Sequence, residues 1–243
     1  FNSAFVPLFA KKLEGDGVSA ARRFAEEALA VLLFALLVLT AVAEIAMPWL
    51  MYGLAPGFAE QPEKFDLTVL LTRIAFPYLL CMSVVALLSG VLNSMQRFTA
   101  AAAAPILLNV VLIGTMLTAA FLGVGNSADA GIVLAWGVAV AGTLQLLMLA
   151  YAAYRAGVGL GFRRPRLTPD VRRLLTLGVP GVIAGGITQI NIAIGTIIAS
   201  LQAGAVSYLY YADRIYQLPL GVVGIAIGVV LLPDISRKLR AGD

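Results

Sequence analysis

Histidine is absent from the 243-residue sequence, and cysteine occurs once, as Cys81 within an apolar run. These absences exclude histidine-based catalysis, a histidine metal site and a disulfide within one chain. The sequence also shows no nucleophile–base pair, no paired carboxylates, no phosphate-binding glycine loop and no set of metal ligands. The residues therefore predict a protein that is not an enzyme and that uses no cofactor or metal.

Charged residues are also scarce, at 12% of the chain against 60% hydrophobic residues, and the mean hydropathy is +0.94. A soluble domain of this size needs far more polar surface, so the composition indicates an integral membrane protein. Alternation with a period of two residues is missing, which argues against a transmembrane barrel. The net charge is +4, and most of the basic residues lie in short connections between apolar runs. We interpret it as a topology signal and expect no nucleic-acid partner.

Apolar runs that could cross roughly 30 Å of hydrocarbon recur along the chain and predict an all-α, polytopic transmembrane helix bundle. A partial helix is expected over residues 1–10, and full spans over 24–52, 66–95, 100–123, 129–155, 173–201 and 204–233. The sequence begins with FNSAFVPLFAKK and has neither an initiator methionine nor a signal-peptide pattern. We therefore expect an internal piece of a longer protein, or one with its ends removed.

Basic residues mark one side of the predicted bundle. Connections alternate between the two sides, and 14 of the 17 lysines and arginines fall on one of them. The opposite side carries only Lys64, beside Glu60, Glu63 and Asp66. The positive-inside rule then places the basic side, including the segment 157–172, in the cytoplasm.

A polar stretch interrupts the last apolar run, SYLYYADRIYQLPLGVVGIAIGVVLLPD, from Ser207 to Asp234. Arg214 lies about ten residues into this span, roughly 15 Å deep and near the bilayer midplane. A charge at that depth costs roughly 2.5–3.5 kcal/mol or more, so Arg214 is expected to face the bundle interior or a water-filled cavity. A helical periodicity puts several polar residues on the face of Arg214. They are Ser207, Tyr210, Tyr211 and Gln217, followed by Gly221.

Two roles are open for Asp213 and Arg214. The planar arginine fork stays charged and binds phosphate oxygens in pairs, so Arg214 is a candidate anion contact in a cavity. The further candidate substrate-binding residues are Ser207, Tyr211, Asp213 and Gln217. The alternative is a buried ion pair that only holds helices together, although neighbouring residues on a helix do not face each other.

Other polar residues lie within the predicted spans. Gln189 and Asn191, in PGVIAGGITQINIAIGTIIAS, either line the cavity, bind an ion or form hydrogen bonds between helices. Arg73 is a further candidate for the cavity, but it lies about two turns into its span and its side chain can also extend to the interface.

Four segments carry a family resemblance: SAFVPLFAKK, APGF, FPYLLCMSVVALLSGVLNSMQRFTAAAAAPILLN and SYLYYADRIYQLPLGVVGIAIGVVLLPDISR. They resemble the MurJ (MviN) family, the lipid II flippases of bacterial cell-wall synthesis in the multidrug/oligosaccharidyl-lipid/polysaccharide exporter superfamily. The resemblance implies part of a two-lobed, MATE-like transporter, running from the end of the second helix to the eighth. It implies an N-terminal lobe over residues 1–156, a cytoplasmic basic linker over 157–172 and the start of the second lobe over 173–243.

The resemblance also implies a function. A family member would translocate lipid II, whose headgroup is linked to undecaprenyl pyrophosphate, across the bacterial inner membrane by alternating access. Lipid II and membrane lipids would be its partners, and Arg214 would match a cavity arginine. Some members bind sodium through an acid on the seventh helix, but no acid occurs between Arg173 and Asp213. The alternatives are a cation, drug or other polysaccharide-lipid exporter of the same superfamily, and a membrane scaffold without transport.

Overall fold

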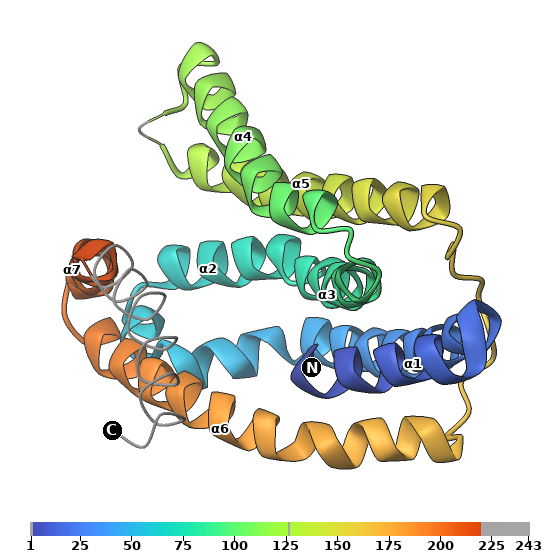
Figure 1. Ribbon diagram of the computed structural model, residues 1–243. Coiled ribbons are helices and arrows are strands. Elements are labelled where there is room, and N and C mark those ends of the chain that lie inside the picture. Colours follow the sequence, from blue (N-terminus) through green and yellow to red (C-terminus); the bar gives the residue numbers. More distant parts are fainter. Residues whose placement is uncertain (1, 126, 220–243) are drawn as a thin grey trace, which may run out of the picture.

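The computed structural model describes residues 2–125 and 127–219, and every regular element in these ranges is a helix (Figure 1). In chain order the elements are α1 (Asn2–Leu54), the short 3-10 helix η1 (Pro56–Glu60), α2 (Pro62–Ala75), α3 (Tyr78–Ser94), α4 (Thr99–Phe121), α5 (Ala128–Arg155), α6 (Pro169–Ser200) and α7 (Ala205–Pro219). The predicted helix bundle is confirmed. The part of the last predicted span beyond residue 219, with Gly221, lies outside the described residues.

Helix α1 consists of two arms that fold back on each other at Gly17 (Figure 1). The backbone of Gly17 has φ 82° and ψ 175°, a conformation that residues with a Cβ rarely adopt. Phe5 on the first arm stacks on Phe24 of the second arm, with ring centroids 5.6 Å apart. The expected helix over residues 1–10 therefore continues to the bend, and the expected connection between residues 10 and 24 is helical on both sides of Gly17.

The predicted span over residues 66–95 is two helices, α2 and α3, which meet at Phe76 and Pro77. Proline has no backbone N–H and its ring crowds the preceding turn, which interrupts a helix at that point. The backbone N–H of Leu79 donates to the carbonyl of Phe76 at 3.0 Å, so a tight turn bridges the interruption. Together the two helices are long and apolar enough to form one membrane span of 33 residues.

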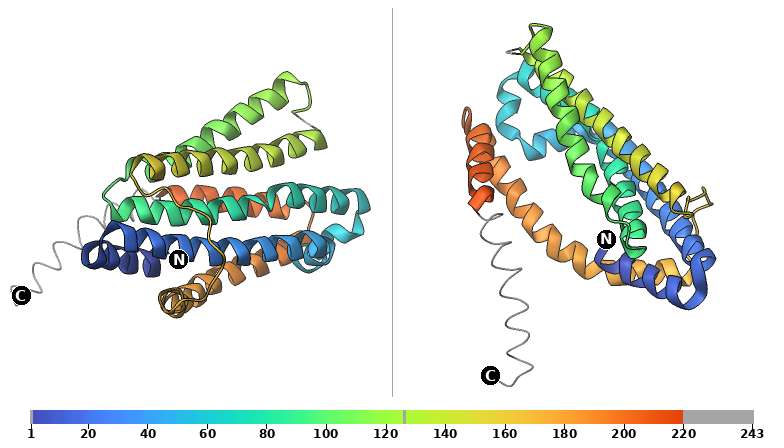
Figure 2. Two further views of the ribbon diagram at one scale, coloured as in Figure 1. Left: turned by 90° about the vertical axis from the view of Figure 1, so that its right-hand side faces the viewer. Right: turned by 45° about the horizontal axis from the view of Figure 1, so that its top comes forward.

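The helices are arranged in successive layers, with α1 between α6 and α3, and with α5 between α3 and α4 (Figures 1 and 2). The main core lies where α1, α3 and α5 meet, and its largest fully buried side chains include Phe5, Phe9, Phe24, Leu87, Leu92 and Leu149. A second, smaller core joins the end of α1 to α2 through Met47, Met51, Phe65 and Val69.

Large apolar side chains cover the outside of this bundle. On α4 and α6, Ile106, Ile113, Val182 and Ile187 are each more than half exposed. Within the described residues, five helical segments are long and apolar enough to span a membrane. Such a surface is stable in hydrocarbon, because its side chains are apolar and the helices satisfy their own backbone hydrogen bonds.

Candidate functional site

The polar face of α7 carries a chain of side-chain contacts around Arg214. Its Nη1 donates to Oε1 of Gln217 at 3.4 Å, and Nε2 of Gln217 donates to Oδ2 of Asp213 at 2.6 Å. Gln217 lies three residues after Arg214 and four after Asp213, so all three belong to neighbouring turns of one helix. Gln217 therefore connects the two charged groups without a direct contact between them.

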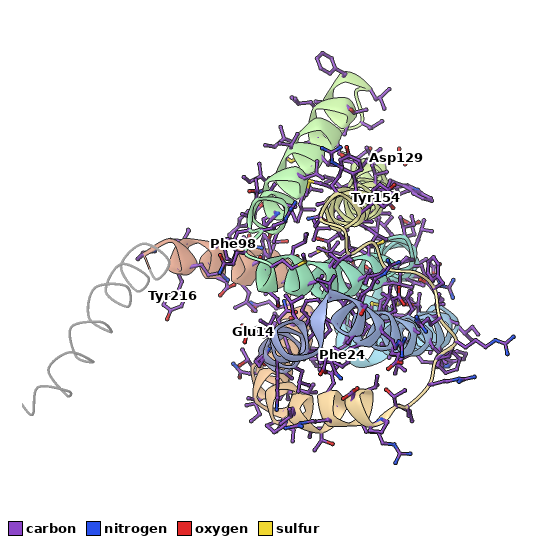
Figure 3. All side chains as sticks on the ribbon, turned by 45° about the vertical axis from the view of Figure 1, so that its right-hand side comes forward. Glu14, Phe24, Phe98, Asp129, Tyr154 and Tyr216 are labelled. Atoms are coloured by element: carbon purple, nitrogen blue, oxygen red, sulfur yellow. The ribbon has the colours of Figure 1, made fainter. Side chains whose placement is uncertain are left out.

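Aromatic rings extend this face. The guanidinium carbon of Arg214 lies 4.9 Å from the ring centroid of Tyr210, within the range of a cation–π contact. The Tyr210 and Tyr211 rings meet edge to face at 6.0 Å. Tyr216 projects from α7 at the edge of the molecule (Figure 3). The guanidinium is thus supported on one side by a ring and on another by an amide.

The side chains of Asp213, Arg214 and Gln217 are exposed on α7, as is Ser207. No ion pair joins Asp213 to Arg214 in the part of the chain that the structure describes. The Nη2 and Nε groups of Arg214 have no hydrogen-bond partner among the described residues. This arrangement leaves paired N–H donors available to an anion.

The remaining candidates lie elsewhere. Gln189 and Asn191 are exposed on α6, which contacts α7 further along, where Leu209 approaches Gly195. No hydrogen bond joins either side chain to Arg214 within the described residues. Arg73 lies on α2, and its Nε donates to the backbone carbonyl of Glu44 on α1 at 3.2 Å. The structure therefore groups the α7 residues but not Gln189, Asn191 or Arg73 with them.

A second polar cluster, which the sequence reasoning missed, surrounds Glu26 on α1. Glu26 as a whole residue is only 5% exposed. Its Oε1 accepts hydrogen bonds from Nε of Arg22 at 3.0 Å and from the backbone N–H of Gly161 at 3.1 Å. Its Oε2 accepts from Nε of Arg163 at 2.5 Å. We call Arg22, Glu26, Gly161 and Arg163 the Glu26 clamp, because they fix the segment between α5 and α6 to α1.

Two more contacts join the same regions. The hydroxyl of Thr168 donates to Oε2 of Glu27 at 2.9 Å, and Lys12 pairs with Asp170 at 2.8 Å. Thr168 is also the N-cap of α6, where its hydroxyl accepts from the backbone N–H of Val171. The spacing of Arg22 and Glu26, four residues apart on one helix, is the sequence signal that could have revealed the clamp.

At the opposite end of the bundle, η1 approaches the end of α6. The backbone N–H of Gly57 donates to Oγ of Ser200 at 3.3 Å. A Cβ on Gly57 would overlap the backbone of Ser200 and Leu201, so only glycine permits this approach. Helix α6 is thus held near both ends, whereas its central glycines, Gly185 and Gly186, have no neighbouring atoms within 4 Å where a Cβ would lie.

Comparison with known proteins identifies close relatives. A family model described as "Lipid II flippase MurJ" matches residues 1–243. The chain is 54% identical to a "Probable lipid II flippase MurJ" of Rhizobium meliloti (strain 1021) and 53% identical to one of Rhizobium tropici, in each case over 100% of this chain and 45% of the relative. It is 37% identical to a "Lipid II flippase MurJ" of Burkholderia cenocepacia, over 98% of this chain and 46% of the relative. The chain therefore spans about 45% of the length of these curated relatives.

Proposed function

The chain belongs to the MurJ family of lipid II flippases, and from that premise we propose that the whole protein translocates lipid II between the leaflets of the membrane. The family and the apolar helices together indicate a multi-pass protein of the bacterial inner membrane. The proposed substrate is a polar headgroup joined through pyrophosphate to a prenyl chain. Its headgroup would cross within the protein while the prenyl chain stays in the bilayer.

The observation that carries this proposal is that Arg214 lies deep in a predicted membrane span with N–H donors that no described residue uses. A guanidinium roughly 14 Å along α7 from Ala205 is costly in hydrocarbon, which implies a wet surface or an anionic ligand in the complete protein. Its free Nη2 and Nε groups match the oxygens of a pyrophosphate, and Tyr210 and Gln217 restrict its movement. Ser207, Tyr211 and Asp213 would line the same surface.

Two groups of helices would move against each other in this proposal. The first is residues 1–156, the second begins at residue 173, and the linker 157–172 joins them. The close contact between Gly57 and Ser200 at one end supports a state in which the two groups meet on the side opposite the basic residues. Alternating access then requires that this contact opens when the headgroup is released.

Transport by the full-length protein in lipid vesicles is the direct test. Vesicles would carry lipid II with a fluorescent headgroup, and a membrane-impermeant reductant would report the share in the outer leaflet. We expect accelerated exchange of lipid II and no acceleration for a phosphatidylcholine with the same fluorophore. A cation or drug exporter would instead accumulate its own substrate and leave lipid II unmoved, which would contradict the proposal.

A further inference from the structure

The two arginines of the Glu26 clamp present unused donors to the surroundings. Arg22 and Arg163 both bind Glu26 through Nε. Their terminal Nη groups have no hydrogen-bond or ion-pair partner in the described part of the chain. The two side chains are 46% and 47% exposed, whereas that of Glu26 is 6% exposed. One buried carboxylate thus orients two guanidinium groups whose paired donors face outward.

These guanidinium groups line a hollow of about 510 Å³ together with Val18, Ser19, Arg23 and Gly157. Three arginines and one glutamate contribute charge to its wall, and both oxygens of the glutamate already accept hydrogen bonds. The hollow is therefore positive and rich in N–H donors. Oriented guanidinium groups of this kind favour the oxygens of a phosphate over a single point charge.

An apolar pocket of about 520 Å³ adjoins this hollow, and Arg22 lines both. Its walls come from α1, α3 and α5, and Tyr154 of α5, which is labelled in Figure 3, is one of its lining residues. The apolar lining includes Leu29, Leu33, Leu80, Val84, Leu88 and Leu147, and the segment 159–162 closes one side. The backbone N–H of Gly161 binds Glu26, so the clamp also fixes this wall. The volume falls within the range of roughly 300–1,000 Å³ found for small-molecule sites.

We propose that the hollow and the pocket together bind an anionic phospholipid of the leaflet on the basic side of the bundle. Its phosphate lies on Arg22 and Arg163, and one acyl chain occupies the apolar pocket. Glu26 is a positioning residue, because it orients both arginines and holds the pocket wall without contacting the lipid. The apolar half distinguishes this ligand from a soluble phosphate, and the oriented donors distinguish the site from general attraction of lipid to basic residues. The site is separate from the Arg214 surface and does not depend on the proposed transport activity.

Photolabelling of the full-length protein tests this proposal. The probe is phosphatidylglycerol with a diazirine in one acyl chain, and labelled peptides are identified by mass spectrometry in nanodiscs of phosphatidylcholine. We expect labels on peptides that contain Leu33, Val84 and Leu147. Arg22→Gln with Arg163→Gln should reduce the labelling by roughly tenfold or more. The matched control, Arg97→Gln with Arg173→Gln, removes the same charge from exposed positions on the same side and should keep the labelling.

The double arginine variant leaves Glu26 buried without its arginine partners, so a second variant tests the pocket alone. Ala150→Trp fills the pocket and should remove the labelling, whereas Val140→Trp, on the exposed part of the same helix, should not. The site would be overturned if the test and control variants lost labelling equally. It would also be overturned if both test variants were labelled as strongly as wild type. A prenyl pyrophosphate that displaces the probe better than unlabelled phosphatidylglycerol would overturn the choice of ligand.

Discussion

Among single residues, Arg214 and Arg22 have guanidinium groups with two different kinds of hydrogen-bond partner. Arg22 gives its Nε to a buried carboxylate, while Arg214 gives Nη1 to a neutral amide that itself binds Asp213. A neutral partner compensates less charge than a carboxylate, so Arg214 retains more of its attraction for an external anion. The first prediction follows from this difference.

Arg214→Ala in the full-length protein should abolish lipid II transport while abundance and melting temperature stay near wild type. The reason is that, among the described residues, the Arg214 side chain bonds only to Gln217 and lies on the ring of Tyr210, and all three are exposed. Arg214→Lys should restore part of the transport, since lysine keeps the charge but loses the paired donors. Transport and abundance would be scored separately.

The comparison with Asp213→Asn plus Arg214→Gln separates the two roles. If the charges only hold helices together, removing Arg214 alone strands a carboxylate, and breaking a buried pair costs about 3–5 kcal/mol. The double variant would then recover both fold and transport. Normal transport by the double variant would therefore refute the anion contact.

A second prediction at this scale concerns Glu26→Gln. Glutamine keeps the shape of the side chain but replaces an acceptor oxygen by an NH₂ group that cannot accept from arginine. We expect the full-length protein to lose about 1.5–3 kcal/mol of stability, the usual range for hydrogen bonds to a charged group. Trypsin should also cleave after Arg163 faster. Glu14→Gln, an exposed residue on the same helix, is the control and should change neither the melting temperature nor the cleavage rate.

Residues of the site could be predicted from the sequence only where a rule singles them out. Arg214 stands out because a charge deep in an apolar run is costly. Glu26 does not, because it lies at the edge of the span expected over residues 24–52, where a glutamate needs no explanation. Its importance depends on Gly161 and Arg163, which are 135 and 137 residues away in the chain and reach it only through the fold.

At the scale of elements, apolar runs predict the helices more reliably than their interruptions. The span expected over residues 129–155 is α5, Ala128–Arg155, because loop residues and charges border its apolar run. The division of α2 from α3 at Pro77 was not predicted, since proline is also tolerated within membrane helices. The bend at Gly17 was not predicted either, because Lys12, Glu14 and Asp16 near it are typical of a polar connection.

The contact between η1 and α6 gives the prediction at this scale. In Gly57→Ala, the new Cβ would overlap the backbone of Ser200 and lie 2.7 Å from Cα of Leu201, so the two elements must separate. Overpacking of this kind typically costs about 1–3 kcal/mol, and we expect a lower melting temperature with impaired transport. Gly53→Ala, where a Cβ meets nothing within 4 Å, should resemble wild type. Equal melting temperatures for the two variants would show that the contact does not contribute to stability.

For the whole molecule, both ends of α6 are tied to the preceding helices, but by different chemistry. On the basic side, charged groups hold the connection through the Glu26 clamp and through Lys12 and Asp170. On the other side, a backbone contact at Gly57 does so. Both kinds of contact can exchange their partners for water when they open, because charged side chains, backbone N–H groups and hydroxyls all form hydrogen bonds with water. Of the two ties, the contact at Gly57 is the one that alternating access, as proposed above, requires to open.

The last prediction is the orientation of the molecule in the membrane. Because the sequence assigns 14 of the 17 basic residues to connections on one side, we expect the segment 157–172 in the cytoplasm and the η1 region outside. The full-length protein, with Cys81 and every other native cysteine replaced, would carry a single cysteine at Arg164→Cys or at Glu60→Cys. Both native side chains are exposed, so differences in labelling would report the side of the membrane and not burial. A membrane-impermeant maleimide added to spheroplasts should label position 60 and not 164, and permeabilised cells should be labelled at both. Labelling of 164 but not 60 in intact spheroplasts would reverse the orientation. It would also move the phospholipid site on Arg22 and Arg163 to the outer leaflet, because the site and the linker lie on the same side of the bundle.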